Sequence, residues 1–126
     1  MNKVLAVLTG IVIMMGSTFA YSFNTVLKSD VINVKASSSS DIFTVGDNTV
    51  TIELTDSKGN HIEDAEISVY YFMPSMPAMN YEVTSKLSNE KYTAVVKPTM
   101  PGKWAADIKV KKSGEENTLS VNFNAK

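Results

Sequence analysis

Two stretches decide the fold of this chain: TVTIELT at residues 49–55 and AEISVYYFM at residues 65–73. In both, the side chains alternate with a period of two, which sends them to opposite faces of a β-strand. The first stretch directs Val50, Ile52 and Leu54 to one face and polar residues to the other. Its β-branched residues strengthen the prediction of a strand with one solvated face.

The same alternation continues toward the C-terminus. Inward-facing residues are predicted in two further strands, over 104–111 (Trp104, Ala106, Ile108, Val110) and 118–124 (Leu119, Val121, Phe123). Residues 81–87 and 91–97 flank a predicted hairpin turn at 88–90. No segment keeps a helical period, and turn signals separate the strands. About seven short strands predict an all-β, immunoglobulin-like antiparallel sandwich, with a small barrel as the alternative.

The N-terminus reads as a targeting segment. Lys3 precedes an uncharged run over residues 4–20, and small residues, Thr18 and Ala20, end it. This pattern predicts a secretory signal peptide over 1–20, or an uncleaved anchor helix that tethers the chain to the inner membrane. Residues 21–36 are expected to form a lead-in and 37–126 the sandwich. We therefore expect an extracytoplasmic protein, periplasmic or secreted.

Composition excludes several classes of function. The chain has 126 residues and a formal net charge of −1, and all twelve basic residues are Lys, so a nucleic-acid partner is not expected. It has no Cys, which excludes disulfides, thiolate metal sites and Cys nucleophiles. The single histidine, His61, makes a catalytic triad improbable. We therefore expect a binding protein and no enzyme.

The chemistry points to the stretch FMPSMPAMNY at residues 72–81. Met73, Met76 and Met79 fall within seven consecutive residues, and Met100 follows in a second Met-Pro pair near Trp104. Thioethers are soft, neutral ligands that favour Cu(I), and by the same softness Ag(I), over Zn²⁺ or hard cations. Outside the cytoplasm, a Met-x-x-Met-x-x-Met run is a sensible feature for handling copper.

The prolines constrain the expected geometry. Pro74 and Pro77 form a Pro-x-x-Pro pattern, which favours polyproline II. Neighbouring methionines would then share one edge with their Cα atoms roughly 9 Å apart. A site with three sulfur ligands would need a bend at Ser75 or Ala78, or a ligand from Met100. Trp104 would be placed to cover a bound cation with its ring.

Structural interpretations of the same residues stay open. A Met/Pro loop also suits packing at one end of a sandwich, and Met73 continues the inward face of its strand. An exposed loop of this kind equally suits docking onto a membrane partner, such as an oxidase or transporter subunit. His61 follows a turn and is expected to be solvated, with a minor alternative as a fourth copper ligand.

Several short pieces, in this order, resemble the YtkA-like domain, close to FixH-type proteins. The pieces are GDNTVTI (46–52), DSKGN (56–60), DA (64–65), MPSM (73–76), Tyr92 and MPGKW (100–104). The likeness spans residues 37–123. It implies a small secreted or membrane-tethered immunoglobulin-like domain that is associated with copper or heavy-metal handling and with assembly of copper-containing respiratory complexes.

The resemblance also bears on the ligands. The Met-Pro-x-Met pattern carries over to Met73, Pro74 and Met76. Family members often continue with a Gly/His-rich stretch, whereas residues 77–80 here read PAMN. Without that histidine, Cu(I) or Ag(I) bound through thioethers is favoured over Cu(II). A membrane copper transporter or oxidase subunit is the partner that the resemblance implies.

Overall fold

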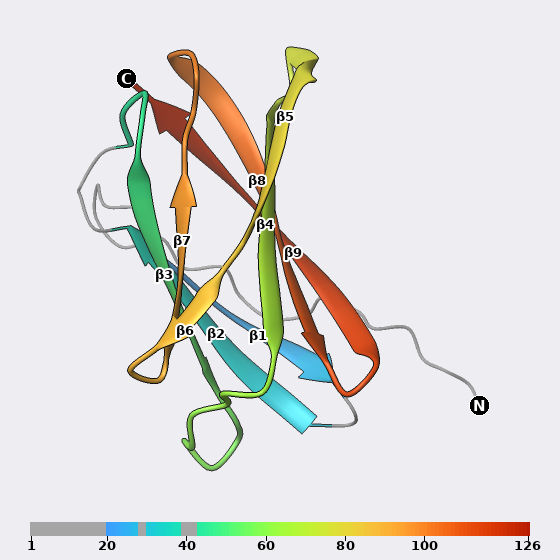
Figure 1. Ribbon diagram of the computed structural model, residues 1–126. Helices are drawn as coiled ribbons and strands as arrows, with labels where there is room; N and C mark the ends of the chain where they lie inside the picture. Colours follow the sequence, from blue (N-terminus) through green and yellow to red (C-terminus); the bar gives the residue numbers. More distant parts are fainter. Residues whose placement is uncertain (1–19, 28–29, 39–42) are drawn as a thin grey trace.

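The computed structural model describes residues 20–27, 30–38 and 43–126, which form two antiparallel sheets (Figure 1). The five-stranded sheet has the order β1-β2-β3-β7-β6, and the four-stranded sheet has the order β5-β4-β8-β9. The strands are β1 (Ala20–Leu27), β2 (Asp30–Ser38), β3 (Asn48–Thr55), β4 (Glu66–Met73), β5 (Met76–Thr84), β6 (Lys86–Ser88), β7 (Lys91–Val96), β8 (Gly102–Lys112) and β9 (Glu115–Ala125). The predicted all-β sandwich is confirmed.

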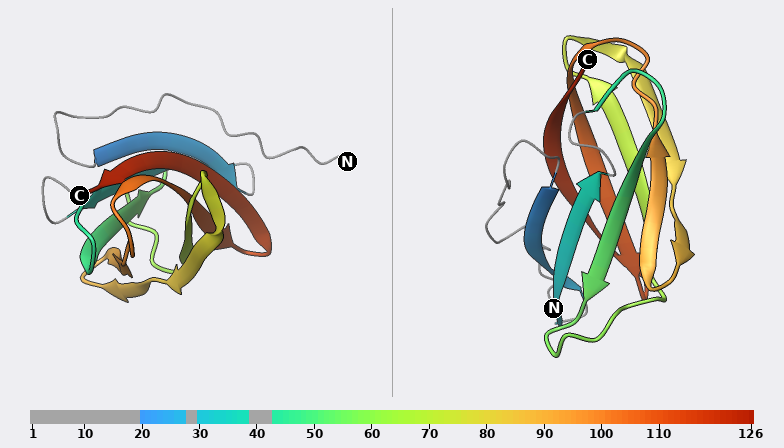
Figure 2. Two further views of the ribbon diagram at one scale, coloured as in Figure 1. Left: turned by 90° about the horizontal axis from the view of Figure 1, so that it is seen from above. Right: turned by 90° about the vertical axis from the view of Figure 1, so that its left-hand side faces the viewer.

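The core lies between the two sheets, which curve around it (Figure 2). It is built from the alternating residues that the sequence predicts: the inward faces of β3, β4, β8 and β9 are buried. Trp104 is the largest fully buried side chain, at 1% exposure. Two tight hairpins follow their turn chemistry, since Asn89 and Glu90, and likewise Ser113 and Gly114, take positive φ.

The expected lead-in over 21–36 is wrong for its described residues, because 21–27 lie in β1 and 30–36 in β2. On β2 the residues Ile32, Val34 and Ala36 are buried in strict alternation. On β1 the buried Thr25 replaces an apolar residue, which hides the strand pattern in the sequence. The Asn117 amide of β9 donates hydrogen bonds to Thr25 Oγ1 and to the Val26 carbonyl oxygen. These bonds satisfy the buried hydroxyl and hold β1 beside β9.

The predicted signal peptide or anchor helix lies, apart from Ala20, outside the described residues. Over the part of the chain that is described, no helix has the length and apolar character needed to span a bilayer.

Tyr92 joins β7 to the connection between β3 and β4. Its hydroxyl donates to the Ile62 carbonyl oxygen at 2.9 Å and accepts the Ala65 N–H at 3.1 Å, and the residue is 2% exposed. Burial raises the pKa of Tyr92 above its ordinary value of 10.0, and the nearby carboxylates of Asp64 and Glu63 act in the same direction. The folded state therefore favours the protonated phenol.

The Tyr92→Phe variant is expected to lose about 1–2 kcal/mol of unfolding free energy at neutral pH, because two buried backbone groups lose their partner. The wild-type chain should also lose stability as pH rises above 10.0, since the unfolded phenol ionises first while the folded one keeps its proton. Urea denaturation across that range measures both. An alkaline loss as steep in Tyr92→Phe as in the wild type would contradict the role of this phenol.

Candidate functional site: the methionine end of the sandwich

The β4–β5 hairpin carries the MPSM stretch at its turn. Met73 ends β4 and pairs with Met76, the first residue of β5, across the two-residue turn Pro74-Ser75. Pro74 fixes its own φ near −65°, and Ser75 has no positive φ, so the turn is not of the primed type that matches strand twist. Strand pairing is interrupted directly after it, and residues 77–79 have no counterpart on β4.

The polyproline geometry is therefore wrong for the Met73–Met76 segment. Side chains that lie opposite each other in an antiparallel pair share one face, with Cβ atoms roughly 5 Å apart. Met73 and Met76 form such a pair, so their thioethers start much closer together than an extended helix would allow. Pro74 is here a turn residue, because it lies between the end of β4 and the start of β5, where the chain reverses direction.

The four methionines differ in burial. Met73 is 5% exposed and belongs to the core, as its place on the inward face of the strand predicts. Met76 is 45% exposed. Met79 and Met100 are half-buried and pack against the core. This end of the sandwich thus combines one displayed thioether with three that are partly or fully covered.

Two backbone features hold the covered methionines. A Cβ placed on Gly102 would lie 3.1 Å from Met73 Cε, so the glycine makes room for the thioether methyl group. Gly102 also has a φ of +133°, a conformation that L side chains rarely adopt. The indole N–H of Trp104 donates to the Met100 carbonyl oxygen at 3.0 Å, which anchors the β7–β8 loop.

An aromatic cluster lies beneath the methionines. Trp104 has ring centroids 6.0 Å from Tyr71, 6.3 Å from Tyr81 and 6.4 Å from Phe123. Because it is buried and surrounded by these rings, Trp104 is not placed to cover a cation at the surface, contrary to the sequence expectation. Its role at this end is to support the loop that carries Met100.

Tyr81 is the residue of this end that the sequence reasoning missed. It pairs with Tyr71 across the sheet, lies at the exposed edge of the aromatic cluster and is 36% exposed. Its hydroxyl lies 3.2 Å from Thr99 Oγ1, which links β5 to the β7–β8 loop. The hairpin and this loop thereby form one end of the sandwich, seen at the top of Figure 1. The only sequence signal was its position two residues after Met79.

His61 lies at the other end of the sandwich, in the connection between β3 and β4 (Figure 1). The eight residues of β4, which span about 25 Å at 3.3 Å per residue, separate this connection from the hairpin turn. Its Nε2 atom lies 3.5 Å from Glu90 Oε1. The alternative of His61 as a fourth ligand beside these methionines is therefore wrong.

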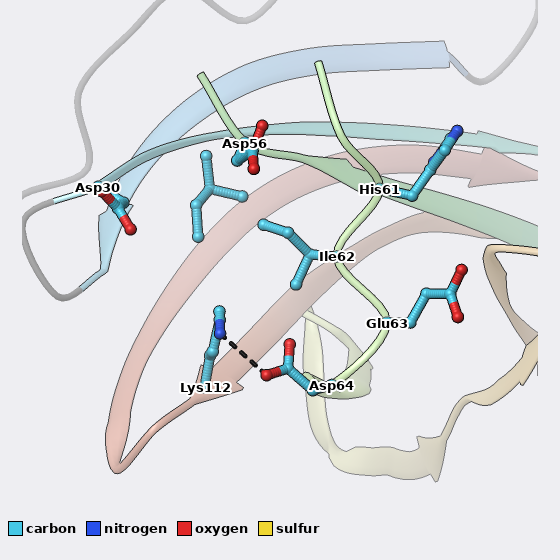
Figure 3. Close-up of a pocket in the computed structure, with 8 residues that line it drawn as sticks. Asp30, Asp56, His61, Ile62, Glu63, Asp64 and Lys112 are labelled. Atoms are coloured by element: carbon cyan, nitrogen blue, oxygen red, sulfur yellow. Dashed lines mark hydrogen bonds and ion pairs between the residues drawn. The ribbon is translucent and has the colours of Figure 1, made fainter. Parts of the chain in front are cut away.

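An open pocket of about 550 Å³ occupies the His61 end (Figure 3). It is lined by Asp30, Ile32, Asp56, His61, Ile62, Glu63, Asp64 and Lys112. Lys112 Nζ donates to Asp64 Oδ2 at 3.0 Å. The backbone N–H groups of Asn60 and Lys58 hydrogen-bond to the Asp56 carboxylate and lower its pKa. Among the described residues, no group of three or more His, Asp or Glu side chains is placed to hold a metal ion.

Comparison with known proteins gives a match to one family model. The sequence model of the YtkA-like family matches residues 27–109, which include β2 to β7 and most of β8. No match was found among curated proteins or among solved structures. The matched segment contains the hairpin, the β7–β8 loop and Trp104, and it covers well over half of the chain. This chain belongs to the YtkA-like family.

Proposed function

We propose that this protein is an extracytoplasmic, copper-associated binding module that takes up Cu(I) or Ag(I) at its methionine end. The observation that carries the proposal is the cross-strand pairing of Met73 with Met76 at the hairpin turn. Met76 serves as the accessible ligand and Met73 as its partner. Met79 and Met100 are the candidates for a third ligand.

The chemistry of the donors selects the metal. Thioether sulfur is soft and uncharged, so it favours Cu(I) and Ag(I) over Zn²⁺ and hard cations. It also needs no deprotonation, and affinity should therefore change little in mildly acidic solution, where His and Cys sites weaken. The thioether ligands are neutral, and the chain has no Cys and one distant His. Such a set of ligands suits a protein that binds and releases the ion reversibly.

Burial suggests how an ion would enter. Met76 is 45% exposed, whereas Met73 is covered and its methyl group lies beside Gly102. An ion would meet Met76 first, and a rotamer change of the flexible Met73 side chain would bring in the second sulfur. Delivery to or from a membrane copper transporter or oxidase subunit fits the tether that residues 4–20 would provide in the uncleaved form.

Replacing Met76 by Leu is expected to weaken Ag(I) or Cu(I) binding roughly ten-fold or more, because losing a ligand costs at least as much as losing an outer-shell partner. Titration under reductant against a competing chelator measures the affinity. The matched control is Leu87→Met, which adds a thioether at a position with almost the same exposure, 44%, on β6. This control should bind as the wild type does.

Equal affinity of the wild type and Met76→Leu would refute the metal site.

The second candidate function, docking of the same end onto a membrane partner without metal, is favoured by the exposed apolar side chains of Met76 and Val45. Met76 begins β5 at the hairpin turn, and Val45 lies next to the β7–β8 loop, since the neighbouring Gly46 N–H donates to the Pro98 carbonyl oxygen. If docking is the function, the Met76→Leu variant should still dock onto the membrane partner in cells, whereas Met76→Glu should abolish docking.

A further inference from the structure

The four methionines of this end also differ in how readily an oxidant can reach their sulfur atoms. Their sulfur atoms can accept an oxygen atom, and susceptibility follows solvent access. Met76 is 45% exposed, whereas Met73, paired directly with it, is 5% exposed. Met79 and Met100 are half-buried against the core. Of the four thioethers, that of Met76 is therefore the most open to a dissolved oxidant.

We propose that Met76 is a reversible oxidation site that controls metal binding at this end; the control, though not the oxidation itself, rests on the proposed function. The oxidant is a two-electron oxygen donor such as hydrogen peroxide. The sulfur lone pair attacks one peroxide oxygen, the O–O bond breaks, and an S–O bond forms. Met76 is oxidised to the sulfoxide by two electrons, and the peroxide is reduced to water.

Oxidation to the sulfoxide changes the atom that Met76 offers to a metal ion. A thioether is soft and apolar, whereas a sulfoxide is polar and presents its oxygen as a hard atom. The preference for Cu(I) and Ag(I) depends on the soft sulfur, so oxidation of Met76 removes the ligand that an entering ion meets first. Methionine sulfoxide reductases reverse the change, which makes it a switch and not damage.

The fold is placed to survive this modification. Met76 stands on an edge strand at a turn and is 45% exposed, so an added oxygen can point to solvent and needs no space in the core. The same change at Met73 would bring a polar atom into the core, beside Gly102. Burial of Met73 therefore protects the structure, while exposure of Met76 leaves the binding site sensitive.

The test begins with selectivity. The full chain is treated with increasing hydrogen peroxide, and oxidation is located at individual residues by tandem mass spectrometry. Met76 should form sulfoxide roughly ten-fold faster than Met73, with Met79 and Met100 between them. Oxidation of Met73 as fast as that of Met76 would overturn the proposal, whether or not the chain binds metal.

The second part measures Ag(I) affinity of the untreated chain, of chain oxidised at Met76, and of the same material after reductase treatment. Oxidation should weaken binding roughly ten-fold, and reduction should restore it. Met76→Gln, a polar substitute that needs no oxidant, should match the oxidised form with an unchanged unfolding midpoint. The Leu87→Met control should gain a further exposed oxidisable residue, and oxidation at position 87 should not add to the loss of affinity.

The outcomes separate the two proposals. If the untreated chain fails to bind Ag(I), the proposed function fails, and control of metal binding fails with it, while the mass-spectrometric selectivity still decides whether Met76 is the oxidation site. If the untreated chain binds Ag(I) but oxidation at Met76 leaves the affinity unchanged, the proposed control is wrong and the metal site needs other ligands.

Discussion

Replacing Trp104 by Ala is expected to lower the free energy of unfolding by about 3–5 kcal/mol, the usual loss for a large aromatic side chain removed from a core. Trp104 is 1% exposed and lies against Tyr71, Tyr81 and Phe123. Its indole N–H also holds the Met100 carbonyl oxygen. The substitution would therefore leave a cavity and release the β7–β8 loop. Urea denaturation followed by circular dichroism measures the loss.

The Trp104→Phe variant separates the two effects. It keeps an aromatic ring in the core but removes the N–H donor, so a smaller loss of about 1–2 kcal/mol is expected. Because a small domain has only about 5–15 kcal/mol of stability, this variant also keeps the comparison possible if the Ala variant does not fold. A loss below about 1 kcal/mol in Trp104→Ala would show that the ring is not a main support of the core.

Replacing Asn48 by Ala is expected to cost about 2–4 kcal/mol, because buried polar groups would lose their partners. Asn48 is 3% exposed at the start of β3. Its amide donates to the carbonyl oxygens of Thr44, Gly46 and Val96 at 2.8, 2.9 and 3.2 Å, and its oxygen accepts the Thr44 N–H at 3.0 Å. One side chain thus organises the turn that leads into β3.

The matched control for this prediction is Asn124→Ala on the exposed face of β9. An exposed substitution of this type usually changes stability by less than about 0.5 kcal/mol. Thermal and urea unfolding of both variants provide the comparison. Equal stability of the two variants would mean that water replaces the partners of Asn48 at no cost, contrary to its burial.

Much of the fold could be predicted because the decisive signal is local. The residues Val50, Ile52 and Leu54 are spaced for one face of a strand, and burial of that face confirms the prediction. The first strand, β1, was missed because Thr25 interrupts its apolar pattern, whereas β2 was missed although Ile32, Val34 and Ala36 alternate. The burial of Thr25 depends on Asn117, which lies 92 residues away in the sequence, and no local pattern contains that information.

The candidate site was predicted as a set of residues but not as a geometry. Pro74 suits both an extended helix and the first position of a turn, and the choice depends on the partner strand, which the sequence does not name. The roles of Trp104 and Tyr81 also depend on contacts between residues that are distant in the sequence. Trp104, predicted on the inward face of its strand, was also expected to cover a bound cation, whereas the structure buries it; Tyr81, which lies at the exposed edge of the cluster, was overlooked.

The last residues of the chain are fixed beside the methionine end. Ala125 forms a parallel bridge with Phe43, the Val45 N–H donates to the Lys126 carbonyl oxygen, and the C-terminus lies at the same end of the molecule as the hairpin turn (Figure 1). A polyhistidine purification tag appended after Lys126 would therefore start at the end of the sandwich that carries Met76. Its imidazoles would compete for the same soft ions and imitate a high-affinity centre. Recombinant material without such an extension is the form in which the thioethers report their own affinity.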